Sequence, residues 1–235
     1  MASRHSKTWV DLIDEKHPIT AEHGQKLRDQ FADESVIHFR HFFSNEALSI
    51  MSARVAPLLE MTTRRDQMLK GTPRHISTVD AQTITKYVPE VHEFYSDSRL
   101  RKFLQAIWDQ QVYLVHDPVG QFVLNYLHRK GDTHGGHLDR HPLALNVILK
   151  GPTRGGEAEF VPNCDDPKLL DTKWSKKLPL QTGDAYLLQS DTSVHRVAPI
   201  TAGERIALSF SYSDKQRRYE KAYGNELYER CQGSK

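Results

Sequence analysis

Apolar residues recur at helical spacing in the first part of the chain and change to short, closely spaced runs after about residue 111. Residues 21–31 form an amphipathic pattern, and Ser44 stands where a helix N-cap is expected. Two apolar stripes at helical spacing follow, one made of Ala47, Leu48, Met51, Val55, Leu58 and Leu59, the other of Leu100, Phe103, Leu104, Ile107 and Trp108. A short apolar run at 36–39 predicts a strand between helices. We therefore expect residues 1–110 to be mostly helical.

The second part of the chain alternates short apolar runs with Gly and Pro turns. The runs span residues 112–115, 121–127, 143–149, 158–161, 185–188 and 206–212. Many short strands of this kind are typical of a sandwich or barrel. We predict an α+β fold that is mainly β, a double-stranded β-helix (jelly roll) with helices packed outside it. The expected organisation is a single domain over 1–235, with a jelly-roll core at 111–213 and a charged tail at 214–235, helical from Lys215.

Composition narrows the classes of partner. With 38% hydrophobic and 26% charged residues, the chain can bury a packed core. Lys and Arg number 32 and Asp and Glu 30, so the charge gives no argument for a nucleic-acid or anionic-membrane partner. The polar N-terminus predicts no signal peptide, and no apolar stretch is long enough to span a membrane. Cys164 and Cys231 have no metal-ligand spacing and are not needed to explain the fold, which suits a reducing cytoplasm. We expect a small-molecule substrate, and the oligomeric state stays open.

Candidate metal chemistry enters with a His-x-Asp pair. His137 and Asp139 are two residues apart, a spacing that places both side chains on one face of a strand. His195 follows 56 residues after Asp139. Two imidazoles and one carboxylate form the facial triad of non-haem Fe(II) sites, which leaves coordination positions open. The pair alone is weak evidence in a chain with 13 histidines. Zinc accepts the same donors, so a zinc-binding or non-catalytic jelly roll stays open at this point.

An arginine strengthens the iron interpretation. Arg205 lies ten residues after His195, at the start of a run whose alternation puts Arg205, Ala207, Ser209 and Ser211 on one face. A guanidinium there could hold a carboxylate through two parallel hydrogen bonds. A simple zinc site has no need for such a clamp.

These features occur in an order that resembles a known superfamily. His137-x-Asp139 is followed by Gly-Gly-Glu-Ala-Glu-Phe at 155–160, by Gly-Asp-Ala-Tyr-Leu-Leu at 183–188, and then by His195 and Arg205. Over residues 121–212 this set is similar to the iron(II)/2-oxoglutarate oxygenases.

The resemblance implies both the cofactors and the roles of individual residues. Fe(II), 2-oxoglutarate and O2 would take part in the reaction, with His137, Asp139 and His195 as catalytic metal ligands. Arg205 would bind the distal carboxylate of 2-oxoglutarate, with Ser209 or Tyr126 as helpers.

Within the superfamily, residues 134–139 are similar to the branch that hydroxylates or chlorinates free amino acids. That branch places a histidine three residues before the first ligand, where His134 stands. It also holds the substrate carboxylate with an arginine of the helical half, for which Arg74 is the candidate. Chlorinating members replace the carboxylate ligand with glycine, so Asp139 argues against halogenation.

The chain departs from that branch at Arg140, where amine-binding members carry an acidic residue. This departure puts a lysine-like substrate in doubt and leaves a second carboxylate or another anionic group on the substrate open. Plainer interpretations stay open: His134 as an ordinary loop histidine, Arg74 as a solvated arginine of a Pro-led loop, and Arg140 as a surface residue.

We therefore predict an Fe(II)/2-oxoglutarate-dependent dioxygenase that hydroxylates an unactivated C–H bond of a free amino acid or related carboxylate. Two alternatives use the same cofactors. Desaturation or cyclisation diverges only after hydrogen abstraction, so the ligand residues do not separate it from hydroxylation. A protein-directed hydroxylase is the other alternative.

Overall fold

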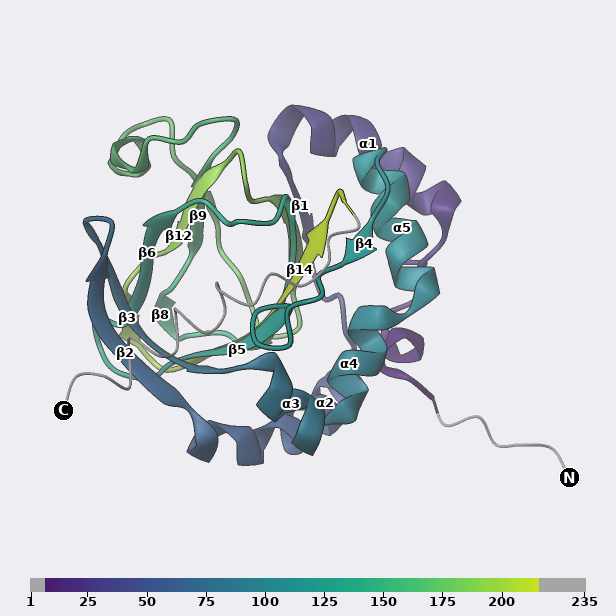
Figure 1. Cartoon of the computed structure of the whole chain (residues 1–235), viewed down its shortest axis with the longest axis horizontal. Helices are drawn as coiled ribbons and strands as arrows, with labels where there is room; N and C mark the ends of the chain where they lie inside the picture. The colour runs from purple at the N-terminus through teal and green to yellow at the C-terminus, as the bar shows by residue number, and fades with distance from the viewer. Residues whose placement is uncertain (1–6, 216–235) are drawn as a thin grey trace, which may run out of the picture.

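One large antiparallel sheet, curled into a jelly roll, dominates the protein (Figure 1). The structure is a computed structural model that describes residues 7–215, so the predicted tail beyond Lys215 and Cys231 lie outside the described residues. Twelve strands join in the order β1-β11-β7-β14-β5-β3-β6-β12-β9-β10, with β2 paired to β3 and β4 to β14. This architecture confirms the predicted mainly β jelly roll with helices outside it.

The strand bounds match the predicted runs closely from residue 112 onward. The strands are β1 (Val36–Phe39), β2 (Thr63–Leu69), β3 (Thr72–Val79), β4 (Tyr113–Leu114), β5 (Phe122–Leu127), β6 (Thr133–His137), β7 (Leu143–Lys150), β8 (Arg154–Gly155), β9 (Ala158–Val161), β10 (Lys176–Leu178), β11 (Ala185–Gln189), β12 (Val194–Val197), β13 (Ile200–Ala202) and β14 (Arg205–Ser213). β13 and β8 form a separate small sheet. After residue 112, the apolar runs did not indicate five of these strands. The five are short or interrupted by polar residues and glycine, so they carry little apolar signal: β6, β8, β10, β12 and β13.

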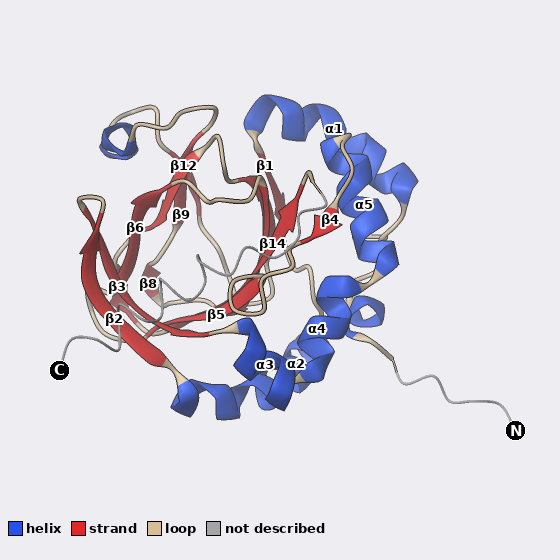
Figure 2. Cartoon of the chain, in the orientation of Figure 1, coloured by secondary structure: helices blue, strands red, loops and turns tan. Residues whose placement is uncertain are grey.

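Five α-helices pack against one side of the sheet (Figure 2). They are α1 (Ala21–Glu34), α2 (Asn45–Val55), α3 (Ala81–Tyr87), α4 (Pro89–Ser96) and α5 (Ser98–Trp108). Short 3-10 helices lie before α1 (η1, Trp9–Leu12), directly after α2 (η2, Ala56–Met61) and between β9 and β10 (η3, Pro167–Asp171). Ser44 caps α2 as predicted, because its side chain accepts a hydrogen bond from the Ala47 N–H. Among the described residues, no helix is long and apolar enough to span a membrane.

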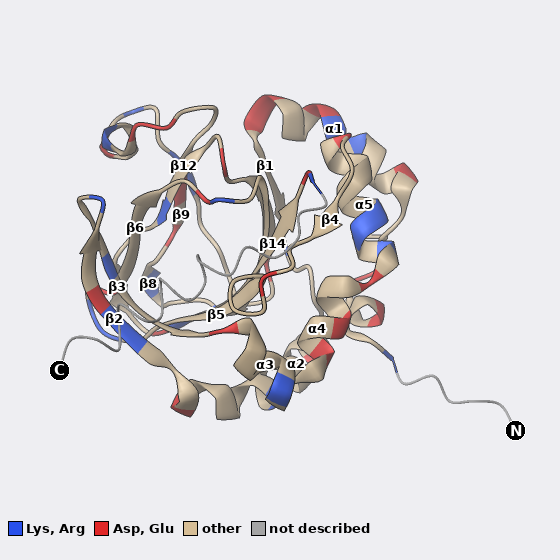
Figure 3. Cartoon of the chain, viewed as in Figure 1, with Lys and Arg blue, Asp and Glu red and all other residues tan. Residues whose placement is uncertain are grey.

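The N-terminal part also contains a hairpin that the apolar pattern did not indicate. Strands β2 and β3 pair from Thr63↔Thr78 to Leu69↔Thr72, and Lys and Arg lie along them (Figure 3). The loop between them is Lys70-Gly71, with φ of 48° and 79°. Two consecutive positive φ values suit the tight turn of a twisted hairpin, for which Lys-Gly is a weaker signal than Asn-Gly. The plainer alternative for Arg74, a solvated arginine of a Pro-led loop, is therefore excluded, because Arg74 is a buried residue of β3.

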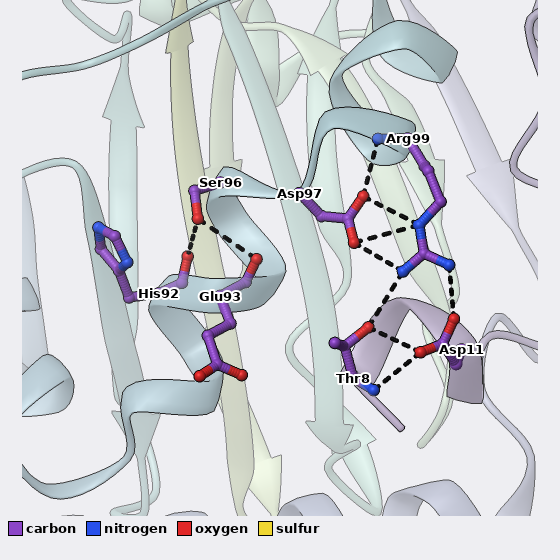
Figure 4. A network of polar contacts seen from close by, with 7 residues as sticks. All are labelled: Thr8, Asp11, His92, Glu93, Ser96, Asp97 and Arg99. Atoms are coloured by element: carbon purple, nitrogen blue, oxygen red, sulfur yellow. Dashed lines mark hydrogen bonds and ion pairs between the residues drawn. The ribbon is translucent and has the colours of Figure 1, made fainter. Parts of the chain in front are cut away.

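A polar network fixes the start of the chain to the helical layer (Figure 4). Asp97 caps α5 by accepting the Arg99 N–H, and Arg99 Nη2 donates to Asp97 Oδ2 at 2.7 Å. Arg99 Nη1 donates to Asp11 Oδ1 at 2.5 Å, and Arg99 Nη2 also reaches Thr8. Since Asp11 belongs to η1, this arginine holds the first turn against the N-terminus of α5.

Helices and barrel share one core. The main cluster of buried apolar side chains extends from Trp9 in η1 to Tyr212 in β14. Phe94 of α4 packs on Phe210 of β14 with ring centroids 5.2 Å apart. The Tyr95 hydroxyl donates to the Ser211 carbonyl and accepts from the Val115 N–H, so its buried oxygen is satisfied. The helical layer therefore packs against the outside of the barrel and shares its core.

Candidate active site

A cavity of about 550 Å³ opens into the barrel between the β2–β3 hairpin and the strands β5, β6, β7, β12 and β14. His137, Asp139 and His195 all line it. So do Arg205, Ser209, His134, Arg74 and Arg140, whereas Tyr126 is not among its lining residues. The structure thus brings together all but one of the site residues that the sequence predicted.

His137, Asp139 and His195 form a compact triad. Asp139 Oδ1 lies 3.4 Å from His137 Nε2, and Asp139 Oδ2 lies 3.7 Å from His195 Nε2. One ligand atom from each residue lies within 4.8 Å of the others, and no other group of this kind occurs within residues 7–215. The two histidines face each other across the β6–β12 pair. Strand β6 ends at His137, so the expectation that Asp139 shares a regular strand with it is wrong; the carboxylate comes from the following turn.

Backbone contacts orient the two imidazoles. His137 Nδ1 lies 2.8 Å from the Gly135 carbonyl, and His195 Nδ1 lies 3.0 Å from the Ser193 carbonyl. A carbonyl partner places the proton on Nδ1, which leaves the Nε2 lone pair facing the triad centre. The Asp139 N–H donates to the Ser190 carbonyl at 2.8 Å, which fixes the turn that carries the carboxylate.

Protonation states also suit a divalent metal. Burial, together with the nearby His137, lowers the pKa of His195 to about 4, so its imidazole is neutral at neutral pH. Burial disfavours the Asp139 carboxylate, but His195 and His137 outweigh it and hold the pKa of Asp139 well below its usual value. The neutral imidazole of His195 and the ionised carboxylate of Asp139 are therefore in the ligand form that non-haem iron requires, and His137 directs its Nε2 to the same centre.

Arg205 places a buried guanidinium, with one nitrogen that lacks a hydrogen-bond partner, in the same cavity. Its side chain is 2% exposed, and burial lowers the pKa of Arg205 while a hydrogen bond with Tyr186 opposes this. The Nε atom of Arg205 has no hydrogen-bond partner. Within the described part of the chain no carboxylate is paired with it. Because an unpaired buried charge is costly, this donor set fits an anionic ligand that enters from the cavity, such as the distal carboxylate of 2-oxoglutarate.

A row of polar side chains on three adjacent strands crosses the cavity wall. Asn125 Nδ2 donates to Ser209 Oγ at 2.9 Å, and Ser209 Oγ donates to Asn146 Oδ1 at 2.6 Å. All three residues line the cavity. Sequence reasoning found Ser209 but missed Asn125, Asn146 and Tyr186. An asparagine in the middle of the apolar strands β5 and β7 was the available signal, because a polar residue there needs a partner inside the barrel.

Tyr126 points away from this wall. Its hydroxyl donates to Glu204 Oε1 at 2.9 Å, and its ring stacks on His128. Period-two alternation explains the difference, since its neighbours Val123 and Asn125 face the cavity. Tyr186 of β11 is the tyrosine that contacts Arg205.

Arg74 is a rigid part of the cavity wall. Its side chain is 5% exposed, and it lies opposite His134 in the β3–β6 pair. Its Nη1 donates to Thr72 Oγ1 at 2.8 Å and to the carbonyls of Pro73 and Gly135 at 3.1 and 2.9 Å. Three acceptors on one nitrogen fix the plane of the guanidinium.

His134 lies between Arg74 and the triad. Its ring centroid is 4.2 Å from that of His137. Burial, reinforced by the charges of His137 and Arg74, holds the pKa of His134 well below its ordinary value. A neutral imidazole at this position can donate one hydrogen bond and accept another. Arg140 follows Asp139 directly and is an exposed residue at the cavity rim.

Comparison with known proteins adds family information. A family model described as HalD: Halogenase D matches residues 19–231. The comparison with curated proteins returned no match.

Several solved structures share the fold. The non-heme alpha ketoglutarate dependent carbocyclase SnoK from nogalamycin biosynthesis is 14% identical, with a TM-score of 0.66 over 95% of this chain and 92% of that chain. A prolyl hydroxylase from Trichoplax adhaerens, in complex with a hypoxia inducible factor peptide, is 15% identical, with a TM-score of 0.64 over 91% of this chain and 96% of that chain. The epimerase SnoN, in complex with Fe3+, alpha ketoglutarate and nogalamycin RO, is 15% identical, with a TM-score of 0.62 over 81% and 83%. At such identities the likeness establishes the jelly-roll fold alone.

Proposed function

The chain belongs to the family described as Halogenase D, within the Fe(II)/2-oxoglutarate oxygenases, and from this premise we propose that it hydroxylates an unactivated C–H bond of a small substrate. The substrate class is a free amino acid or related carboxylate. The observation that carries the proposal is the pairing, in one cavity, of the His137–Asp139–His195 triad with a buried guanidinium whose Nε lacks a partner.

Each residue of the site has a role in this proposal. His137, Asp139 and His195 hold Fe(II) on one face. Arg205 pairs with the distal carboxylate of 2-oxoglutarate, and Tyr186 orients the guanidinium. Ser209, fixed between Asn125 and Asn146, is positioned to hydrogen-bond the same carboxylate.

Fe(II) held by His137, Asp139 and His195, together with 2-oxoglutarate and O2, would supply the oxidation. One oxygen atom enters the substrate C–H bond as hydroxyl, and the other enters succinate as CO2 is lost from 2-oxoglutarate. The chain's own residues bind, orient and exclude water. Arg74 holds the substrate carboxylate against β3, and the neutral imidazole of His134 makes the adjoining hydrogen bond.

Asp139 favours hydroxylation over halogenation. A halide bound to iron needs a coordination position that no protein ligand fills. The Asp139 carboxylate lies between the two Nε2 atoms, at 3.4 and 3.7 Å, where it supplies the third ligand. The family is described as a halogenase, whereas the reaction that we propose for this chain is hydroxylation.

The size of the cavity supports a small substrate. About 550 Å³ must accommodate 2-oxoglutarate as well as the substrate, which leaves room for a molecule of amino-acid size. We also place the protein in the cytoplasm, since Cys164 is a free thiol that suits a reducing compartment.

The test is aerobic turnover of the iron-loaded protein with 2-oxoglutarate, chloride and a panel of free amino acids. We expect one panel member to stimulate succinate formation and to gain one oxygen atom. A product lighter by two hydrogen atoms would replace hydroxylation by desaturation or ring closure. Turnover of a protein partner, with no free amino acid accepted, would replace the substrate class.

A further inference from the structure

The three metal ligands are carried by different kinds of backbone. His137 ends β6 and His195 lies within β12, so the pairing of these two strands fixes both histidines. Asp139 instead lies in residues 138–142, a segment outside any helix or strand, which we call the ligand turn. A metal ligand must be held within about 0.5 Å of its productive position. The ligand turn therefore needs contacts beyond those of the β6–β12 pair.

Ser190 supplies these contacts from the end of β11. It is fully buried, its carbonyl accepts the Asp139 N–H at 2.8 Å, and its own N–H donates to the Pro142 carbonyl at 2.9 Å. The preceding residue, Gln189, is paired with Leu143 of β7. The ligand turn is therefore fixed at two points to a residue that the large sheet itself holds in place.

The Ser190 hydroxyl adds a contact with the metal ligand. Its Oγ donates to the His141 carbonyl at 3.0 Å, within the ligand turn. Burial raises the pKa of Asp139, and a hydrogen bond from the Ser190 side chain is among the contacts that outweigh this effect and lower it. A hydroxyl has one proton to donate, and an ionised acceptor forms the stronger bond. The Asp139 carboxylate and the turn that carries it thus share one buried donor.

Ser190 can act on the reaction only through Asp139 and its turn. It is not among the residues that line the cavity, and its complete burial excludes contact with a substrate. The carboxylate oxygens of Asp139 lie 3.4 Å from His137 Nε2 and 3.7 Å from His195 Nε2. When these nitrogens bind a metal they no longer hydrogen-bond to the carboxylate, whereas the Ser190 hydroxyl still can.

We propose that Ser190 is a positioning residue of the metal site, whose hydroxyl holds the Asp139 carboxylate in the orientation that binds iron. This inference rests on the proposed function, which makes Asp139 an iron ligand. Loss of the hydroxyl leaves both backbone contacts of Ser190 in place, so the ligand turn keeps its path. The carboxylate then gains freedom to rotate or to bind the metal through both oxygens. Hydrogen-bond partners of metal ligands contribute about 10–100-fold to metal affinity.

The experiment removes the hydroxyl and measures metal binding. Ser190→Ala should weaken Fe(II) binding by about 10–100-fold, as measured by anaerobic equilibrium dialysis and metal analysis. It should also shift the charge-transfer absorption of the anaerobic iron–2-oxoglutarate complex, because this absorption depends on the geometry of the ligands around iron. Ser190→Thr, which keeps a hydroxyl, should retain most of the affinity and the absorption of the wild type.

Thr133→Val is the matched control. Thr133 is buried, and its hydroxyl donates to the Val197 carbonyl at 2.6 Å, so the variant also removes a buried hydroxyl close to the triad. Because this hydroxyl bonds to a backbone carbonyl rather than to a metal ligand, Thr133→Val should keep normal Fe(II) affinity. Urea denaturation of the metal-free proteins measures how much stability each variant loses.

The outcomes separate this inference from a general loss of stability and from the proposed function. Wild-type Fe(II) affinity in Ser190→Ala, or an equal loss of affinity in Thr133→Val, would overturn the inference and leave the oxygenase assignment standing. A folded Ser190→Thr protein that binds iron as weakly as Ser190→Ala would also overturn it. If the added methyl group prevents folding, the contrast between Ser190→Ala and Thr133→Val decides. Failure of the wild type to bind Fe(II) and 2-oxoglutarate would instead remove the proposed function itself.

Discussion

At the residue scale, Arg205 and Asp139 decide which ligands the cavity accepts. Arg205 is a buried cation whose Nε lacks a partner, so it favours an anion over water. Asp139 stays ionised because the two histidines outweigh the effect of burial on its pKa. In the proposed function, Arg205 selects the cosubstrate, and Asp139 fills the metal position that a halide would need.

Replacing Arg205 should separate 2-oxoglutarate binding from metal binding. Arg205→Ala should weaken 2-oxoglutarate by roughly a hundredfold, since two charged hydrogen bonds are lost, and leave iron content near normal. The charge-transfer absorption of the anaerobic iron–keto acid complex reports the first quantity, and metal analysis the second. Tyr126→Phe is the control, because the Tyr126 hydroxyl contacts Glu204 rather than the cavity. Unchanged 2-oxoglutarate affinity in Arg205→Ala would remove the clamp assignment.

Replacing Asp139 tests the choice between hydroxylation and halogenation. Asp139→Gly should lower hydroxylation by more than about tenfold, since losing even outer partners of a metal costs 10–100-fold. Removing the carboxylate also opens a metal position to chloride or azide. Product mass in the presence of each anion is the measurement. Full hydroxylation by this variant would show that Asp139 is not a ligand.

The sequence alone was sufficient to find the site residues that are recognised by their spacing along the chain. The triad and Arg205 could be found because two-residue and ten-residue spacings carry chemical meaning. Asn125, Asn146 and Tyr186 could not, because their meeting depends on which strands pair, and β5, β14, β7 and β11 are distant in sequence. Tyr126 was misplaced for a related reason, since one residue of register turns a side chain from the cavity to the outside.

At the element scale, the β2–β3 hairpin forms one wall of the cavity, which we propose to be the substrate side. Its contact with β6 is close, since a Cβ on Gly135 would lie 2.6 Å from the Pro73 carbonyl oxygen. Gly135 also supplies the carbonyl that accepts from Arg74 and faces His137 Nδ1. The close approach therefore links the substrate arginine to a metal ligand, and glycine is required by space rather than by conformation.

Gly135→Ala should move the hairpin away from β6. Overpacking of this kind costs about 1–3 kcal/mol of stability, and the displaced Arg74 should raise the KM for the substrate. Gly71→Ala is the matched control at the hairpin tip, where φ is 79° and no atom lies within 4 Å of an added Cβ. That variant should cost about 1 kcal/mol and leave KM unchanged. Equal KM effects in both variants would contradict the role given to the Gly135 contact.

A buried ion pair fixes the loop that enters β6. Asp132 is 2% exposed; Arg64 donates to both of its oxygens at 2.8 and 2.7 Å, and the His128 and Arg129 N–H groups add further bonds. Burial opposes ionisation, but these donors outweigh it and lower the pKa of Asp132 below the ordinary value of an aspartate. A lowered folded pKa means that the stabilisation is present above the unfolded pKa and is lost as pH falls through the folded value.

Asp132→Asn should therefore destabilise the protein by about 2–3 kcal/mol at neutral pH, because it leaves Arg64 partly buried without this partner. Urea denaturation at several pH values measures the free energy of unfolding of both proteins. The difference between Asp132→Asn and the wild type should shrink as the pH falls below 3.8. Asp66→Asn removes the exposed partner of Arg64 and should cost less than about 1 kcal/mol. A difference that does not depend on pH would contradict the ion-pair account.

At the scale of the whole molecule, helices and jelly roll form one continuous core. Phe94 from α4 contacts Phe210 of β14, and the Tyr95 hydroxyl donates a hydrogen bond to the backbone of the same strand. The jelly roll and its helices could be predicted from the change in apolar periodicity. The common core could not, because periodicity shows which face of an element is apolar but not which element covers it.

The shared core predicts one cooperative unfolding transition. Phe94→Ala should cost about 3–5 kcal/mol and destabilise helices and sheet together. Far-ultraviolet circular dichroism and tryptophan fluorescence should report coincident midpoints in both proteins. Two separated transitions would contradict the single-domain organisation that we propose for the described residues.

The most direct test of the central claim is the product of aerobic turnover by the iron-loaded wild-type protein with 2-oxoglutarate, chloride and the panel of free amino acids. If the protein is a hydroxylase, we expect succinate in equal amount to a product that has gained one oxygen atom. A chlorinated product, or 2-oxoglutarate that neither binds nor turns over, would contradict it.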